Sequence, residues 1–173
     1  TDQPVSVRQG EDINLAALSD YLANHASQIG VVKGQQQFPG GYSNLTYLLR
    51  TETNEYILRR PPFGAAIKSA HDMGREFKVL SLLRDHYSRI PVPIIHCDDP
   101  EIIGAPFYIM ERIRGIILRP SSVKEIRLAP AEMRKISESL VDNLVVLHSL
   151  DIQKTGLVQL GKPEGYVQRQ VEG

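Results

Sequence analysis

Apolar residues follow a helical period at the start of the chain and then give way to strand-like segments. Leu15, Leu18 and Leu22 recur at helical spacing behind Asn14, a residue type that caps helices, which predicts an N-terminal helix. After residue 30, short segments typical of strands follow. The predicted strands cover 31–38, 44–50 and 55–60. Short polar or glycine-containing turns separate them, which favours antiparallel pairing.

The second part of the chain repeats this change from helical to strand patterns. A helix is expected over 69–87, where Ser69 and Asp72 have the spacing of a capping box and Met73 and Phe77 belong to an apolar stripe. Two strands are then predicted at 93–97 and 106–111. A linker over 115–129 and a last helix from Pro130 onward follow them. This order predicts an α+β fold, with a five-stranded antiparallel sheet and one helix packed on it.

Composition narrows the classes of protein that fit this pattern. The 173 residues are 42% hydrophobic, and 20 Lys and Arg balance 20 Asp and Glu. These values exclude wholesale disorder and a nucleic-acid binder that relies on a strongly basic surface. No apolar run approaches the ~20 residues that span a membrane, so no membrane partner is expected. Cys97 is the single cysteine, fits a reducing, cytoplasmic compartment, and is expected to be a buried small side chain.

The two ends of the sequence suggest a piece of a longer chain. The first residue is Thr1 rather than methionine, and Gly173 ends a polar run without a helix-terminating signal. We therefore expect a fragment that includes one domain and part of a second.

A glycine-rich turn is the first candidate site for phosphate binding. Gly40 and Gly41 lie between two predicted strands and precede Ser43 and Asn44. Backbone N–H groups in such a turn can approach phosphate oxygens closely. Taken alone, the pattern fits an ordinary hairpin turn as well.

A carboxylate on the helix and a cation on the third strand form the second candidate. Glu76 falls within the apolar stripe of the predicted helix, where an unpaired charge would be costly. Strand alternation places Arg59 on the inner face and Arg60 on the outer face, so Arg59 is the expected partner. The alternatives are that Glu76 lies at the rim of the stripe in water and that either arginine is a solvated residue at the end of its strand.

These features follow the order found in the small lobe of a kinase: glycine turn, cation, acid and connector. The chain resembles the aminoglycoside phosphotransferase (choline-kinase-like) family, especially the branch found as the N-terminal domain of some acyl-CoA dehydrogenase family members. The resemblance is carried by 38–47, 56–62, 75–77, 91–93, 104–111, 147–151 and 165–171. It implies an N-terminal helical extension at 1–29, an ATP-binding small lobe at 30–114, and a linker with the start of a large lobe at 115–173.

The resemblance also implies a site, a reaction and its cofactors. ATP would be bound by Gly40, Gly41, Tyr42, Ser43, Asn44, Arg59, Glu76, Met110, Glu111 and Ile113. Arg59 takes the place usually held by lysine, and the full three-glycine pattern of protein kinases is absent. The complete protein would use ATP and Mg²⁺ to phosphorylate a hydroxyl of a small-molecule acceptor.

Catalytic groups are not expected within the sequence. His148 and Asp151 invite a catalytic interpretation, but the family's catalytic loop and metal-binding aspartate are expected further on. After Asp151 the sequence has no histidine, and its only acidic residues are Glu164 and Glu172. The fragment alone is therefore expected to be inactive. A nucleotide-binding pseudokinase and a non-catalytic interaction module remain alternatives, and the acceptor and oligomeric state stay open.

Overall fold

The computed structural model describes residues 3–39, 44–63, 72–118, 126–162 and 164–172. The chain divides into two compact units. The first contains the described residues within 3–81 and 91–115, and the second contains those within 82–90 and 116–172.

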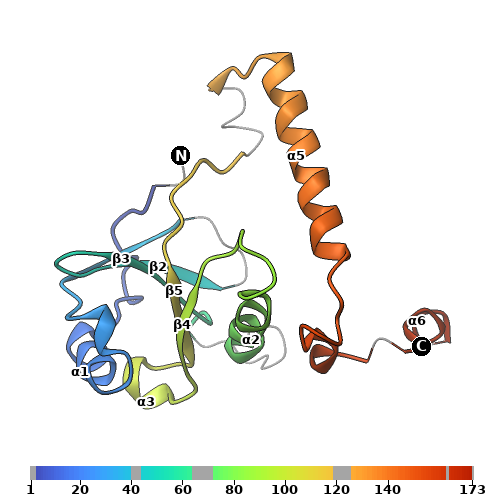
Figure 1. Cartoon of the computed structure of the whole chain (residues 1–173). Helices are drawn as coiled ribbons and strands as arrows, with labels where there is room; N and C mark the ends of the chain where they lie inside the picture. The colour runs from blue at the N-terminus through green and yellow to red at the C-terminus, as the bar shows by residue number, and fades with distance from the viewer. Residues whose placement is uncertain (1–2, 40–43, 64–71, 119–125, 163, 173) are drawn as a thin grey trace. The chain divides into compact units, whose positions relative to one another are not determined.

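A five-stranded sheet forms the centre of the first unit (Figure 1). Its strands are β1 (Gly34–Gln37), β2 (Leu45–Arg50), β3 (Glu55–Arg60), β4 (Pro93–Cys97) and β5 (Phe107–Glu111). Their spatial order is β1-β2-β3-β5-β4, and every neighbouring pair is antiparallel. The predicted five-stranded antiparallel sheet is confirmed, and β5 lies between β3 and the edge strand β4.

Helix α1 (Leu15–His25) covers one face of this sheet. It begins as predicted, because the Asn14 side chain accepts a hydrogen bond from the Ala17 N–H at 3.1 Å. A 3₁₀ turn, η1 (Ser27–Ile29), follows the helix. The shared core is built from α1, the strands and the segments beside them, and includes Leu18, Leu22, Ile29, Tyr47, Leu58, Phe107 and Ile109. The N-terminal helix is therefore part of the core of the sheet.

Helix α2 (Met73–Leu83) covers the opposite face, because its side chains contact the alternate residues of β3 and β5. The predicted start at Ser69 lies outside the described residues. Asp72 itself caps the start of α2, because its carboxylate accepts a hydrogen bond from the Arg75 N–H at 2.8 Å. The sequence pattern predicts Asp72 as the acid of a capping box that begins at Ser69. An added Cβ at Gly74 would lie 3.3 Å from Cε1 of His96, so the missing side chain lets α2 approach the sheet closely.

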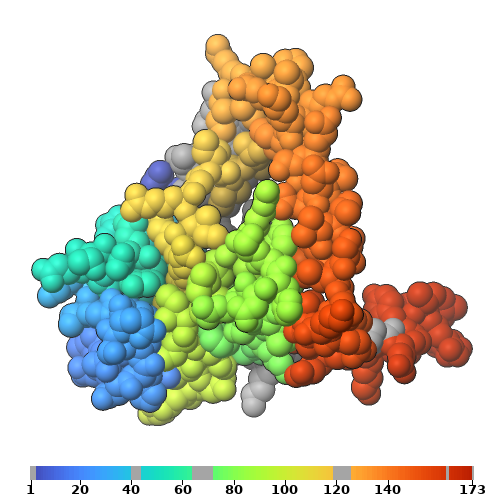
Figure 2. Space-filling view, viewed as in Figure 1, coloured from blue at the N-terminus to red at the C-terminus, as the bar shows by residue number. Residues whose placement is uncertain are grey.

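A short helix, α3 (Pro100–Ile103), connects β4 and β5. Asp99 caps it by accepting from the Glu101 N–H at 2.9 Å, and Gly104 ends it with φ of 82°. In the space-filling view, the surface of α1 (blue) meets that of α3 (yellow-green), so both helices belong to one packed layer (Figure 2).

The second unit contains the long helix α5 (Pro130–His148), the turn η3 (Leu157–Leu160) and helix α6 (Tyr166–Glu172). The α5 helix starts at Pro130 as predicted, and the Glu132 carboxylate accepts from the Ala129 N–H at 2.7 Å. None of the described residues of α5 is buried, and Leu140 and Val145 are among its exposed apolar side chains. Within the described parts of the chain, no helix is long and apolar enough to cross a membrane.

Candidate functional site

The candidate site is built on a row of side chains that crosses three adjacent strands. Thr46 of β2 pairs with Arg59 of β3, and Arg59 pairs with Tyr108 of β5. Directly paired residues of antiparallel strands point to the same face of a sheet. The register therefore brings a hydroxyl, a guanidinium and a phenol together beneath α2.

Glu76 of α2 lies over this row and receives hydrogen bonds from three residues. Arg59 binds it in bidentate fashion, with Nε 2.8 Å from Oε2 and Nη2 3.2 Å from Oε1. The Tyr108 hydroxyl donates to Oε2 at 2.8 Å, and Nδ2 of Asn44 donates to Oε1 at 2.8 Å. Both oxygens of the carboxylate are thus engaged twice. The predicted Glu76–Arg59 ion pair is present.

The charges of this network are stabilised by their hydrogen bonds. Burial by itself raises the pKa of Glu76, but hydrogen bonds from Arg59, Tyr108 and Asn44 outweigh that effect and hold the pKa below its ordinary value of 4.5. Burial lowers the pKa of Arg59, but its hydrogen bond to Glu76 and the neighbouring charges raise it overall. Burial and the Glu76 charge raise the pKa of Tyr108, so its phenol remains a donor.

The geometry of Arg59 leaves part of its guanidinium able to bind an anion. Nη1 donates to the Thr46 hydroxyl at 3.1 Å, so the Thr46 and Glu76 contacts together use three of the roughly five N–H groups of the side chain. The side chain is still 27% exposed. A cation that is held rigidly on one edge and reaches solvent on another is suited to phosphate oxygens.

The described residues do not fit a magnesium site. None of them form a group of three or more His, Cys, Asp or Glu side chains that could hold a metal. The Glu76 carboxylate is already engaged by the hydrogen bonds of Arg59, Tyr108 and Asn44. Mg²⁺ prefers several free oxygen ligands, which this carboxylate does not offer.

The glycine turn can be followed only at its end. Gly40, Gly41, Tyr42 and Ser43 lie outside the described residues. Asn44, the residue that follows them, is buried, and its side-chain amide contacts Glu76. Asn44, at the end of the turn, is therefore hydrogen-bonded to the Glu76 carboxylate of α2.

The predicted adenine-binding residues lie at the end of β5 and just beyond it. Met110 pairs with Ile57 of β3 and lies on the face of the sheet that α2 covers. The Glu111 N–H donates to the Val92 carbonyl at 2.9 Å, so this N–H is already engaged within the sheet. The side chain of Ile113 is exposed.

Arg60 does not point into solvent, and that prediction is wrong. Its residue is 1% exposed, and Nη1 donates to the Ile103 carbonyl at 2.9 Å. Its guanidinium carbon lies 3.7 Å from the centre of the Phe63 ring. Strand alternation placed it correctly on the face opposite Arg59, but that face is also covered, because α3 and the segment after β3 enclose it.

Sequence patterns missed two members of the network, Thr46 and Tyr108. Within a strand of apolar residues, Tyr108 looks like one more core side chain. The signal that identifies both residues is their register opposite Arg59, and register depends on which strands pair.

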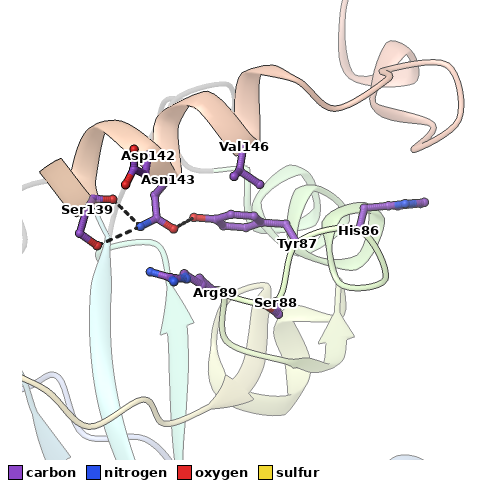
Figure 3. Close-up of a pocket in the computed structure, with 8 residues that line it drawn as sticks. All are labelled: His86, Tyr87, Ser88, Arg89, Ser139, Asp142, Asn143 and Val146. Carbon is purple, nitrogen blue, oxygen red and sulfur yellow. Dashed lines mark hydrogen bonds between the residues drawn. The ribbon is translucent and has the colours of Figure 1, made fainter.

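The second unit contains a separate small pocket of about 230 Å³ (Figure 3). It lies between the turn after α2 and helix α5, where the Tyr87 hydroxyl donates to Oδ1 of Asn143 at 3.1 Å. None of the residues predicted to bind nucleotide line it. The ion pair, and not this pocket, therefore defines the candidate site.

Comparison with known proteins identifies the family. A family model described as phosphotransferase enzyme family matches residues 34–173. The chain belongs to this family. A crystal structure from Ralstonia eutropha, of a protein provisionally described as an aminoglycoside phosphotransferase, is similar to this chain, with a TM-score of 0.72 and 29% identity. The match covers 93% of this chain and 46% of that chain, and it confirms the kinase-like small lobe.

Curated relatives confirm the more specific resemblance. Acyl-CoA dehydrogenase family member 11 of Rattus norvegicus is 37% identical over 99% of this chain, which spans 22% of that protein. Acyl-CoA dehydrogenase family member 10 of Mus musculus is 37% identical over 79% of this chain, which spans 12% of that protein. This chain thus spans less than a quarter of the length of either relative.

Proposed function

We propose that this chain forms the nucleotide-binding part of a small-molecule phosphotransferase, with ATP as the phosphate donor. The observation that carries the proposal is the Arg59–Glu76 pair. A bidentate carboxylate fixes the guanidinium in place, and the remaining exposed edge offers positive charge to the phosphates. Support comes from the phosphotransferase family match.

The other predicted residues take roles around this cation. Backbone N–H groups of the turn at 40–43 would approach the phosphates, and Asn44 would anchor the end of that turn to Glu76. Met110 would line the base pocket, while the Glu111 carbonyl and the Ile113 backbone would meet the adenine edge. Arg59 would orient the α- and β-phosphates.

The reaction would move the γ-phosphoryl group of ATP to a hydroxyl of a small acceptor. The acceptor oxygen forms a bond to phosphorus as its proton passes to a general base, the bond to the β-phosphate oxygen breaks, and ADP leaves. Bound Mg²⁺ would supply charge neutralisation on the phosphates. The residues described here would bind and orient the nucleotide, and the base and metal ligands would come from outside them. We therefore expect residues 1–173 alone to transfer no phosphate.

The test is titration of ATP·Mg²⁺ into the wild-type chain and its Arg59→Ala variant. We expect the variant to bind at least about tenfold more weakly, a loss of about 1.4 kcal/mol. Arg134→Ala is the matched control, because it breaks another arginine–glutamate pair, Arg134–Glu138, in the second unit. Absence of ATP binding by the wild type, or equal binding by Arg59→Ala, would refute the nucleotide site and favour a non-nucleotide interaction module.

Nucleotide binding by the chain does not by itself establish phosphate transfer. Phosphate release or transfer in the complete protein, tested with hydroxylated small molecules, separates a kinase from a nucleotide-binding pseudokinase. Binding without turnover in the complete protein would support the pseudokinase alternative.

A further inference from the structure

A second charged cluster gathers around Glu55, at the opposite end of β3 from Arg60. Nε of Arg50 lies 3.2 Å from its Oε1, and Nη2 of Arg114 lies 2.6 Å from its Oε2. Arg112 also donates to Oε2 through Nη1. One carboxylate is therefore shared by three arginines, one from β2 and two from the connector that follows β5.

At Glu55 and Arg112 this cluster is more enclosed than an ordinary surface ion pair, whereas the Arg114 side chain is 75% exposed. The side chains of Glu55 and Arg112 are both mostly buried. Burial raises the pKa of Glu55, but hydrogen bonds from Arg50, Arg112 and Arg114 together hold it below its ordinary value. Isolated exposed pairs contribute little, whereas a carboxylate that joins several cations loses less side-chain entropy per contact.

The position of the two connector arginines is what makes the cluster informative. Arg112 and Arg114 flank Ile113 directly, and both are tied to the same carboxylate. The mostly buried Arg112 contact is therefore the main hold on the connector backbone, and the exposed Arg114 contact adds to it on the other side of Ile113. The backbone of Glu55 is fixed at the start of β3, because it lies opposite Arg50 in the register of the β2–β3 strand pair and does not depend on the Arg50 side chain.

We propose that Glu55 is a positioning residue for base recognition, acting through a clasp that we define as Glu55, Arg112 and Arg114. The clasp sets the position of the connector backbone at Ile113, the segment expected to meet the adenine edge. Glu55 acts through the connector and does not touch the nucleotide. This inference rests on the proposed function, since it assigns a role within the same nucleotide site.

The test uses two matched variants that each remove one arginine from the same carboxylate. Arg112→Gln breaks the clasp, whereas Arg50→Gln removes an arginine that is not part of the connector. Adenosine probes the base contacts, and inorganic tripolyphosphate probes the phosphate contacts. We expect Arg112→Gln and Glu55→Gln to weaken adenosine binding about fivefold, or about 1 kcal/mol, with tripolyphosphate binding unchanged. Arg50→Gln should bind both probes like the wild type.

Amide hydrogen exchange of the ligand-free chain provides a second readout. Faster exchange at 112–115 in Arg112→Gln, but not in Arg50→Gln, supports the clasp even if nucleotide binding fails. The inference is overturned if Arg112→Gln leaves both exchange and adenosine affinity unchanged, or if Arg50→Gln weakens adenosine binding equally. Failure of the wild type to bind either probe would instead count against the proposed function.

Discussion

Removal of one hydroxyl group tests whether the Glu76 network serves nucleotide binding. Tyr108→Phe deletes the hydroxyl that donates to Oε2 of Glu76 at 2.8 Å and leaves the ring in place. The same sheet offers a matched control, Tyr47→Phe. Tyr47 is also buried, and its hydroxyl donates at 2.8 Å to the Glu11 carbonyl, away from the Arg59 row.

The two substitutions should differ in their effect on folding by a modest amount. A hydrogen bond to a charged acceptor contributes about 1.5–3 kcal/mol, and one to a neutral acceptor about 0.5–1.5 kcal/mol. Tyr108→Phe should therefore lower the free energy of unfolding by about 2 kcal/mol and Tyr47→Phe by about 1 kcal/mol. Urea denaturation measures both values.

Nucleotide binding should separate the two variants clearly. Without the Tyr108 hydroxyl, Glu76 loses its hydrogen bond to β5, and its negative charge attracts Arg59 more strongly. We expect ATP·Mg²⁺ to bind Tyr108→Phe about five- to tenfold more weakly by calorimetry, a loss of about 1 kcal/mol. Tyr47→Phe should retain wild-type affinity. Equal affinities in the two variants, at similar folded fractions, would show that the Tyr108 contact is only structural and would refute the reasoning.

Two further substitutions test the charges of the sheet. Because the pKa of Glu76 is depressed in the folded chain, its contribution to stability is present above pH 4.5 and is lost as the pH falls below that value. Glu76→Gln should therefore lower stability at pH 7 by about 2 kcal/mol and flatten the loss of stability below pH 4.5, as measured by urea denaturation across pH. Arg60→Met should cost about 2–3 kcal/mol, since it leaves the Ile103 carbonyl without its donor and removes the Phe63 contact, with ATP affinity unchanged in calorimetry.

Helices and strands could be predicted well where local sequence signals mark both of their ends. The β3 strand was expected at 55–60 and is found as Glu55–Arg60, between a polar turn and two prolines. The last helix likewise begins at Pro130. The order of strands could not be predicted locally, because the placement of β5 between β3 and β4 is decided by long-range pairing.

The site residues also differ in whether a local sequence signal could identify them. Glu76 could be found from the sequence because a carboxylate within an apolar stripe requires a partner, and helical spacing shows the stripe. Arg60 was misplaced because alternation identifies a face but does not say whether another element covers that face. Here α3 supplies a carbonyl and Phe63 supplies a ring, so even the outer arginine is buried.

The chemistry of Arg59 suits the role proposed for it, at a position where the family resemblance would lead one to expect the lysine of protein kinases. A lysine ammonium carries three donors on one compact charge. The guanidinium distributes its donors over a planar fork, so Nε and Nη2 bind Glu76 while Nη1 binds Thr46. This side chain can therefore be held by the sheet and by α2 and still present an edge to an anion. The Thr46 hydroxyl and the Tyr108 phenol belong to the arrangement because they fix that fork in one orientation.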